Sequence, residues 1–260
     1  MVTNDLQGKT ALILGGSSGL GFASAQKLAN HGMRLIIIYR ASRIMAGEIT
    51  ERFQSLSNPE THLTINADAT TTAKIPQLIE QLVTFLGEDK ITMLLHSISK
   101  GNLRPLTGDN PLTTQDFEQT ASSMGISLYT WFQSLTTAQL LEKDARILAF
   151  TSEGGTKPMP GYAAVSVAKA ALEATMRSIA LEYGSTGLTA NCIQAGVTDT
   201  SSLRHIPGVE ELLARSLERN PTNRLTTPQD VANVVYLMCR PEASFINGTI
   251  IKVDGGESLM

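Results

Sequence analysis

The chain has 260 residues, of which 42% are hydrophobic and 17% charged, and its formal net charge at pH 7 is −3. This length and composition allow a large buried core and favour one α/β domain over residues 1–260. A slightly acidic chain lacks the basic field that nucleic acid requires, and no apolar run is long enough to cross a membrane, so we expect neither as a partner.

The two cysteines, Cys192 and Cys239, are far apart and lie in apolar runs. This placement favours buried thiols in a reducing compartment over a disulfide. The first residues lack the basic and apolar regions of a secretory signal, so we expect a cytoplasmic protein. No cluster of histidine, cysteine and carboxylate residues has the spacing of metal ligands, and we expect no metal site.

Short β-branched runs alternate with helical patterns along the whole chain. The apolar runs predict strands at residues 10–14, 34–39, 61–66, 91–95, 145–151, 188–193 and 249–253. The helical patterns lie at 20–31, 41–56, 74–86, 112–140, 161–183, 209–218 and 229–239. Continuous apolar strands that alternate with helices are typical of a parallel sheet covered on both faces. We therefore predict a doubly wound α/β fold of the Rossmann type, with about seven strands and with its ligand at the carboxyl ends of the strands.

A glycine-rich turn follows the first predicted strand and opens the first predicted helix. Glycines let the backbone approach a pyrophosphate closely, and the N–H groups and dipole of a helix N-terminus attract its charge. The turn therefore predicts a dinucleotide phosphate site formed by Gly15, Ser17, Ser18, Gly19, Leu20 and Gly21.

The second predicted strand ends in a basic segment. Folds of this kind that bind NAD usually carry an acid there for the ribose 2′-hydroxyl, whereas this chain has Arg40 and Arg43. Two guanidinium groups suit a 2′-phosphate, so we expect NADPH, with NADH less favoured; two solvated arginines are the alternative. Asp68 follows the third strand and either contacts the adenine amino group or forms a turn, and we place Ala69 in the same site.

Tyr162 and Lys169 are seven positions apart at the start of a predicted helix. The two side chains are therefore expected on one face of this helix, about 10 Å apart along its axis. A cation beside a phenol favours the phenolate, so we expect Lys169 to lower the pKa of Tyr162. The pair is then suited to general acid chemistry.

Several motifs together resemble the short-chain dehydrogenase/reductase superfamily: the glycine turn, Ser152, Tyr162, Lys169 and the segment Val253-Asp254-Gly255-Gly256. Ordinary members have the pattern Tyr-x3-Lys, and here Val165 occupies that tyrosine position. The Tyr-x6-Lys spacing and His96-Ser97-Ile98 resemble the divergent branch of bacterial enoyl-[acyl-carrier-protein] reductases. The ordinary glycine spacing, with the segment 203–207, looks like the NADPH-preferring third class of these enzymes.

The displaced tyrosine is expected to select the bond that is reduced. In a ketone reduction the hydride and the proton reach adjacent atoms. In a conjugate reduction the hydride reaches the β-carbon while negative charge develops on the carbonyl oxygen. A shift of three residues moves the tyrosine about 4.5 Å along the helix axis, which favours the second reaction.

The resemblance implies roles for further residues. Tyr162 would stabilise the enolate of a trans-2-enoyl thioester, Lys169 would bind the nicotinamide ribose, and Ser152 would contact the substrate or merely end a strand. Ser127 appears in place of the catalytic asparagine of ordinary members. The remaining implied cofactor contacts are Ser97, Ile98, Val197 at the carboxamide and Thr200 at the pyrophosphate.

The segment 198–217 follows the sixth predicted strand and is expected to cover the substrate. The resemblance implies an enoyl substrate carried by acyl carrier protein or CoA, and a homotetramer. A basic docking patch for an acidic carrier would consist of Arg204, His205, Arg215 and Arg219. Two alternatives stay open, namely a 3-ketoacyl or other carbonyl reductase, and a non-catalytic NADPH-binding sensor or scaffold.

Overall fold

The computed structural model describes residues 4–200, 203–205 and 208–260. Within these residues, seven parallel strands form one sheet in the order β3-β2-β1-β4-β5-β6-β7. The strands are β1 (Thr10–Leu14), β2 (Arg34–Tyr39), β3 (Leu63–Asn66), β4 (Ile91–His96), β5 (Leu141–Thr151), β6 (Thr189–Ala195) and β7 (Ile250–Val253). The chain reverses its direction across the sheet between β1 and β4, so the doubly wound fold is confirmed and its ligand crevice lies at that point.

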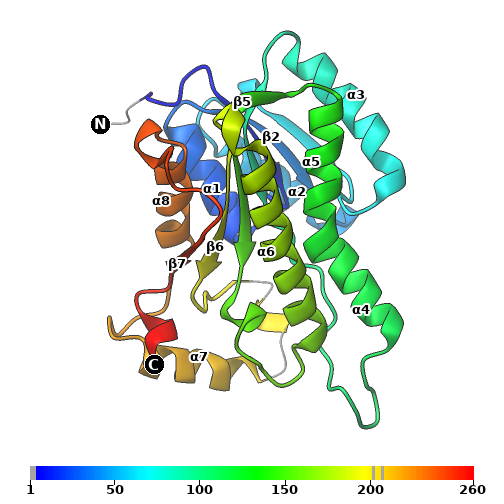
Figure 1. Cartoon of the computed structure of the whole chain (residues 1–260), viewed down its shortest axis with the longest axis vertical. Coiled ribbons are helices and arrows are strands. Elements are labelled where there is room, and N and C mark those ends of the chain that lie inside the picture. Colours follow the sequence, from blue (N-terminus) through cyan, green and yellow to red (C-terminus); the bar gives the residue numbers. More distant parts are fainter. Residues whose placement is uncertain (1–3, 201–202, 206–207) are drawn as a thin grey trace.

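Helices cover both faces of the sheet (Figure 1). One face packs against α1 (Gly19–Asn30), α2 (Ala46–Gln54) and α8 (Pro228–Met238). The other face packs against α3 (Ile75–Leu86), α5 (Ser127–Thr137) and α6 (Ala163–Tyr183), and α4 (Thr114–Ala121) extends from α5 along α6. The helix α7 (Val209–Arg219) lies beyond the carboxyl ends of the strands, beside the C-terminus (Figure 1).

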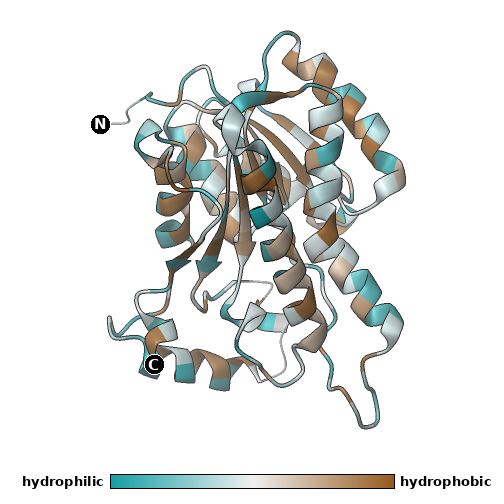
Figure 2. Ribbon diagram, in the orientation of Figure 1, coloured by the Kyte–Doolittle hydropathy of each residue, from teal (hydrophilic) through white to brown (hydrophobic). Residues whose placement is uncertain are grey.

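The strands are apolar on both sides because both faces of the sheet are covered. In β1, Leu12 and Leu14 belong to the core under α3, α5 and α6, whereas Ala11 and Ile13 belong to the core under α1, α2 and α8. This alternation follows the period of two that a strand imposes on its side chains. Figure 2 accordingly shows hydrophobic strands between helices that are hydrophilic on much of their outer surface.

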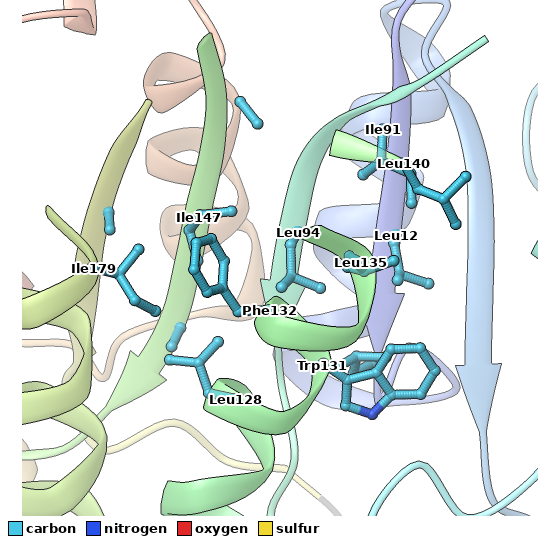
Figure 3. Close-up of a cluster of buried hydrophobic side chains, with 14 of the residues drawn as sticks. Leu12, Ile91, Leu94, Leu128, Trp131, Phe132, Leu135, Leu140, Ile147 and Ile179 are labelled. Carbon is cyan, nitrogen blue, oxygen red and sulfur yellow. The ribbon is translucent and has the colours of Figure 1, made fainter. Parts of the chain in front are cut away.

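Trp131 on α5 connects the core to the ligand crevice. Its indole ring is fully buried beside Leu12 and Leu135 (Figure 3). Its N–H group donates a hydrogen bond of 2.8 Å to the carbonyl oxygen of Ala69. A buried indole N–H requires such a partner, and here that partner fixes the loop that follows β3.

The predicted helix 112–140 is wrong in one respect, because a π-helical turn at Ser122–Ile126 separates α4 from α5. Gly125 in this turn faces α6, and a Cβ atom there would lie 2.7 Å from the carbonyl oxygen of Ala168. Inserted π turns often mark functional sites. The backbone hydrogen bonds that distinguish a π turn from an α-helical turn are not visible in the sequence.

Within the described ranges, no helix is both long enough and apolar enough to span a bilayer.

Candidate active site

A cavity of about 410 Å³ opens at the carboxyl ends of the strands. It brings together most of the residues predicted to bind the cofactor or to act in catalysis. Gly21 and Arg43 are predicted site residues that do not line it. Those that do are Gly15, Ser17, Ser18, Gly19, Leu20, Arg40, Asp68, Ala69, Ser97, Ile98, Ser152, Tyr162, Lys169, Val197 and Thr200.

The glycine turn forms one end of the cavity as a close-packed backbone. Gly15 has a φ of +91°, and a Cβ atom there would lie 2.4 Å from the carbonyl oxygen of Ser97. A Cβ atom at Gly21 would lie 2.3 Å from the Gly15 carbonyl oxygen, so Gly21 acts from behind the cavity by letting α1 pack on the turn. Ser18 makes no side-chain cap and the first turn of α1 has no acid. The partial positive charge of the helix N-terminus therefore fits a pyrophosphate.

Charged side chains around Asp68 line the same cavity as the glycine turn. The Asp68 Oδ2 atom lies 2.9 Å from Lys100 Nζ and 3.4 Å from Arg40 Nη1. Burial acts to raise the pKa of Asp68, but hydrogen bonds from Thr70 and Lys100 outweigh it and hold the pKa below its usual range. The structure thus places Lys100 beside the carboxylate that Arg40 also contacts, whereas Arg43 lies outside the cavity.

Tyr162 and Ser152 meet in the middle of the cavity. Their hydroxyl oxygens are 3.2 Å apart. The sequence places Tyr162 inside a predicted helix at 161–183, whereas in the structure it is the N-cap of α6, which begins at Ala163. Gly154 leaves room for the phenol ring, because a Cβ atom there would lie 2.5 Å from Tyr162 Cε1. The position of the hydroxyl is therefore set by the loop after β5 as well as by α6.

The expectation that Lys169 lowers the pKa of Tyr162 is wrong, because the pKa of this phenol is raised. Burial raises the pKa of the Tyr162 phenol, and the hydrogen bond with Ser152 lowers it by less. The Lys169 ammonium donates a hydrogen bond of 2.6 Å to the carbonyl oxygen of Phe150. The phenol consequently stays protonated at neutral pH and can donate a hydrogen bond.

Lys169 is buried among other titratable groups that sequence reasoning missed. Burial lowers the pKa of Lys169 to about 8, and the nearby Cys192 and Glu173 act in the opposite direction. Glu173 accepts a hydrogen bond of 2.5 Å from Thr151 Oγ1. His96 is fully buried at the end of β4, where burial and the charge of Lys169 lower its pKa to about 3. The spacing of Lys169 and Glu173, four residues apart on one helix, was the available signal for Glu173.

Val165 does not present its side chain to the cavity. It is 4% exposed and packs with Met124 and Ala168. A Cβ atom at Gly101 would lie 2.7 Å from Val165 Cγ2, so the loop after β4 covers this position closely. Tyr162 therefore lines the cavity, whereas Val165, at the tyrosine position of ordinary members, does not.

Ser127, which stands in the sequence where ordinary members have a catalytic asparagine, makes its hydrogen bonds inside the core. Its hydroxyl donates a hydrogen bond of 2.7 Å to the Ser123 carbonyl oxygen and lies 2.8 Å from His96 Nε2. Ser127 is buried and does not line the cavity. The residue that the π turn contributes to the cavity is Met124.

The far end of the cavity is closed by the segment after β6 and by the C-terminal residues. The Val197 N–H group donates a hydrogen bond of 3.0 Å to Glu257 Oε2, and the predicted carboxamide contact of the Val197 backbone stays a prediction. Thr200 lies near the glycine turn, since a Cβ atom at Gly19 would be 3.5 Å from Thr200 Cγ2. Glu257 was missed because nothing near it in the sequence indicates this contact.

Part of the predicted covering segment 198–217 contributes apolar side chains. Leu203 and Leu212 line the cavity together with Met124 and Met159. Residues 201–202 and 206–207 of this segment lie outside the described residues.

The arginines of the predicted basic patch are paired with carboxylates. Arg204 donates to both carboxylate oxygens of Asp199, Arg215 pairs with Glu211 at 2.6 Å, and Arg219 pairs with Glu153 at 2.8 Å. The side chain of His205 lies outside what the structure describes. These arginines therefore carry less net positive charge toward a partner than the sequence alone indicates.

A half-buried phenol that meets a serine hydroxyl, in one cavity with a buried lysine and a backbone cradle for a pyrophosphate, is the arrangement of a short-chain dehydrogenase/reductase that uses a nicotinamide dinucleotide. The family model described as "Enoyl-(Acyl carrier protein) reductase" matches residues 15–258, and the chain belongs to this family.

Relatives of this chain include reductases named for different substrates. It is 28% identical over 260 residues to an enoyl-[acyl-carrier-protein] reductase [NADH], FabI, of Synechocystis, covering 98% of both chains. It is 27% identical over 259 residues to the hydroxynaphthalene reductase arp2 of Aspergillus fumigatus, covering 94% of this chain and 90% of the relative. A short-chain dehydrogenase from Burkholderia cenocepacia, solved in complex with NADP, has a TM-score of 0.83 and 27% identity, covering 97% of this chain and 99% of that chain.

Proposed function

We propose that this oxidoreductase is an NADPH-dependent enoyl reductase of fatty-acid biosynthesis, which reduces the carbon–carbon double bond of a trans-2-enoyl thioester. The bound dinucleotide supplies the hydride for the β-carbon. Tyr162 donates a hydrogen bond to the thioester carbonyl oxygen and stabilises the negative charge that develops there.

The observation that carries this proposal is the position of the phenol. Tyr162 lines the cavity from the N-cap of α6, whereas Val165, in the ordinary tyrosine position, is buried under Gly101. The acid group is therefore displaced by about one helical turn from the place where a proton would meet a ketone oxygen on the carbon that receives hydride. A carbonyl oxygen two bonds further from that carbon fits the displacement.

Lys169 and Ser152 support the phenol in different ways. Lys169 is 6% exposed, and its positive charge stabilises negative charge that develops at the substrate oxygen. Ser152 holds the Tyr162 hydroxyl at 3.2 Å and restricts its orientation. We propose that Tyr162 contacts the substrate directly and that Ser152 orients it.

The apolar lining of the cavity supports an acyl substrate. Met124 lines it from the π turn, and Met159 lines it from the loop after β5. Leu203, which precedes α7, and Leu212, which lies in α7, line it as well. Unbranched methionine side chains adapt to chains of different shape. We propose that the acyl group is carried by acyl carrier protein or CoA.

NADPH is supported by the charges at the adenosine end. The Arg40 side chain is 64% exposed, and Arg40 and Lys100 both line the cavity and contact Asp68, so two cations there suit a 2′-phosphate. A phosphate there would compete with Asp68 for Arg40. The Synechocystis relative is named for NADH, and the Burkholderia structure contains NADP. The choice of NADPH therefore rests on Arg40 and Lys100.

We also propose a homotetramer. Ile126, Tyr129 and Val167 are 46%, 46% and 48% exposed on the π turn, α5 and α6. Exposed apolar side chains on neighbouring helices are suited to contact between subunits. Light scattering of the purified protein tests this, and a monomeric mass would contradict it.

A carbonyl reductase is the second candidate. The distance of 3.2 Å between the Ser152 and Tyr162 hydroxyls suits a ketone oxygen that accepts hydrogen bonds from both, and the Aspergillus relative is named as a hydroxynaphthalene reductase. In this reaction Ser152 would be a direct substrate contact.

The experiment that separates the candidates compares crotonyl and acetoacetyl thioesters, with NADPH oxidation followed by absorbance. The proposal predicts turnover of the crotonyl thioester. Turnover of the acetoacetyl thioester alone would overturn it in favour of the carbonyl reductase. NADPH binding without turnover of either substrate would favour the non-catalytic sensor or scaffold.

A further inference from the structure

We infer that Glu257 is a positioning residue for the nicotinamide half of the dinucleotide site, and that Arg219 joins this residue to the rest of the catalytic cavity. Glu257 lies three residues before Met260 and is 2% exposed. A carboxylate is rarely buried to this extent without a partner. The structure shows which partners it has.

The first partner is the backbone of the segment after β6. Glu257 Oε2 accepts the Val197 N–H group at 3.0 Å. Gly196 lies against the same carboxylate, because a Cβ atom there would be 2.9 Å from Glu257 Oε2 and 2.4 Å from Thr226 Oγ1. Val197 lines the cavity directly, so the carboxylate fixes a piece of its wall from behind.

The C-terminal turn is built to direct Glu257 toward this wall. The Asp254 carboxylate accepts the N–H groups of Gly256 at 3.0 Å and Ser258 at 3.2 Å. These bonds close a short turn around Glu257. Asp254, Glu257 and Ser258 all contribute to the lining of the cavity.

The second partner is Arg219, at the end of α7. Its Nη2 atom donates to Glu153 Oε1 at 2.8 Å and to the Glu257 carbonyl oxygen at 3.1 Å, and its Nη1 atom lies 4.0 Å from Glu257 Oε1. Its Nε atom donates to the Met260 carbonyl oxygen at 3.1 Å. One guanidinium group therefore connects α7, the loop after Ser152 and the C-terminal turn, which lie together in Figure 1.

This arrangement has a selective consequence for binding. Loss of the carboxylate leaves the Val197 N–H group without its partner and releases the segment at the far end of the cavity. The glycine turn keeps its own close contacts, because Gly15 and Gly21 pack against Ser97 and against each other, and Glu257 is not among their nearest neighbours. Replacing Glu257 is therefore expected to weaken binding of the complete dinucleotide and to spare fragments that lack the nicotinamide.

The test measures dissociation constants by titration calorimetry for NADPH and for ADP-ribose 2′-phosphate, which lacks the nicotinamide. NADH and ADP-ribose are measured in parallel, so that a wrong assignment of NADPH is distinguished from a wrong role for Glu257. The variants are Glu257→Ala, Glu257→Gln and the control Glu218→Ala, whose side chain is exposed near the end of α7. Circular dichroism establishes that each variant is folded.

We expect Glu257→Ala to weaken binding of the dinucleotide by about tenfold and to change binding of the fragment by less than about twofold, because the Val197 N–H group loses its acceptor. Glu257→Gln keeps an acceptor oxygen for Val197 and is expected to show a smaller loss. If Glu257→Ala does not fold, Glu257→Gln carries the test with the same selectivity. Equal losses for dinucleotide and fragment, or no loss for either, would overturn the inference.

Discussion

The two ends of the cavity recognise their ligand by different means. At the end where we propose that adenosine and pyrophosphate bind, a glycine turn and a helix N-terminus present their backbone, and the charged side chains around Asp68 are partly exposed. At the catalytic end, buried side chains dominate, with Lys169, Glu173 and Glu257 each at most 6% exposed. Charges act more strongly where water is excluded, so the first end is suited to binding and the second to chemistry.

The comparison first predicts that a change at the catalytic end abolishes turnover without weakening binding. Tyr162→Phe is expected to lower the rate of enoyl reduction by about 10²–10⁴-fold, because the hydrogen-bond donor at the substrate oxygen is removed. NADPH affinity, measured by calorimetry, is expected to stay within about twofold because the phosphate cradle is intact. Tyr129→Phe, which changes an exposed tyrosine on α5, is the matched control. Full activity of Tyr162→Phe would remove the central residue of the proposal.

The converse change acts on the backbone of the binding end. Gly15→Ala is expected to cost at least about 2 kcal/mol of unfolding free energy and to weaken NADPH binding, because the residue has a positive φ and the new methyl group would meet the Ser97 carbonyl oxygen at 2.4 Å. Gly47→Ala in α2, where a Cβ atom has no neighbour within 4 Å, is expected to be neutral or to stabilise by up to about 1 kcal/mol. Denaturant unfolding and calorimetry measure both. Equal behaviour of the two variants would contradict the role of the turn.

The buried lysine gives the catalytic end a pH dependence. The pKa of Lys169 is lowered to about 8 by burial, so its ammonium is present below this pH and is lost above it. We expect kcat/KM for the dinucleotide to fall by about tenfold per pH unit above this value, since this ratio reports ionisation of the free enzyme. His96, Glu173 and Cys192 surround the same lysine.

The control for this profile is Lys169→Arg, whose guanidinium group does not titrate in this range. Its residual activity is expected to lack the decline near pH 8. A decline that persists unchanged in this variant would assign it to another group.

The smallest expected effect separates the two candidate reactions. If Ser152 only orients Tyr162, Ser152→Ala lowers the rate of enoyl reduction by about tenfold or less, as expected for one neutral hydrogen bond. If Ser152 contacts a ketone oxygen directly, the loss in carbonyl reduction approaches that of Tyr162→Phe. Steady-state rates of both variants on both thioesters distinguish these cases.

The difference between the two ends also explains what the sequence could predict. The bounds of β1 and β2 and the glycine turn follow from neighbouring residues, and the structure places them where the sequence predicted. Other features depend on residues far apart in the chain. These are the π turn, the ion pair of Lys100 with Asp68, and the hydrogen bond of Val197 with Glu257. Spacing along one helix placed Tyr162 and Lys169 in the same cavity, but the rise in the pKa of Tyr162 depends on burial that spacing does not reveal.

The most direct measurement of the proposed reaction follows a label. The protein is supplied with crotonyl and acetoacetyl thioesters together, with NADPH that carries deuterium at its reactive carbon, and the products are analysed by NMR. Conjugate reduction predicts deuterium on the β-carbon of butyryl thioester. Deuterium found only on the hydroxyl-bearing carbon of 3-hydroxybutyryl thioester would contradict the proposed role of Tyr162 and identify a carbonyl reductase.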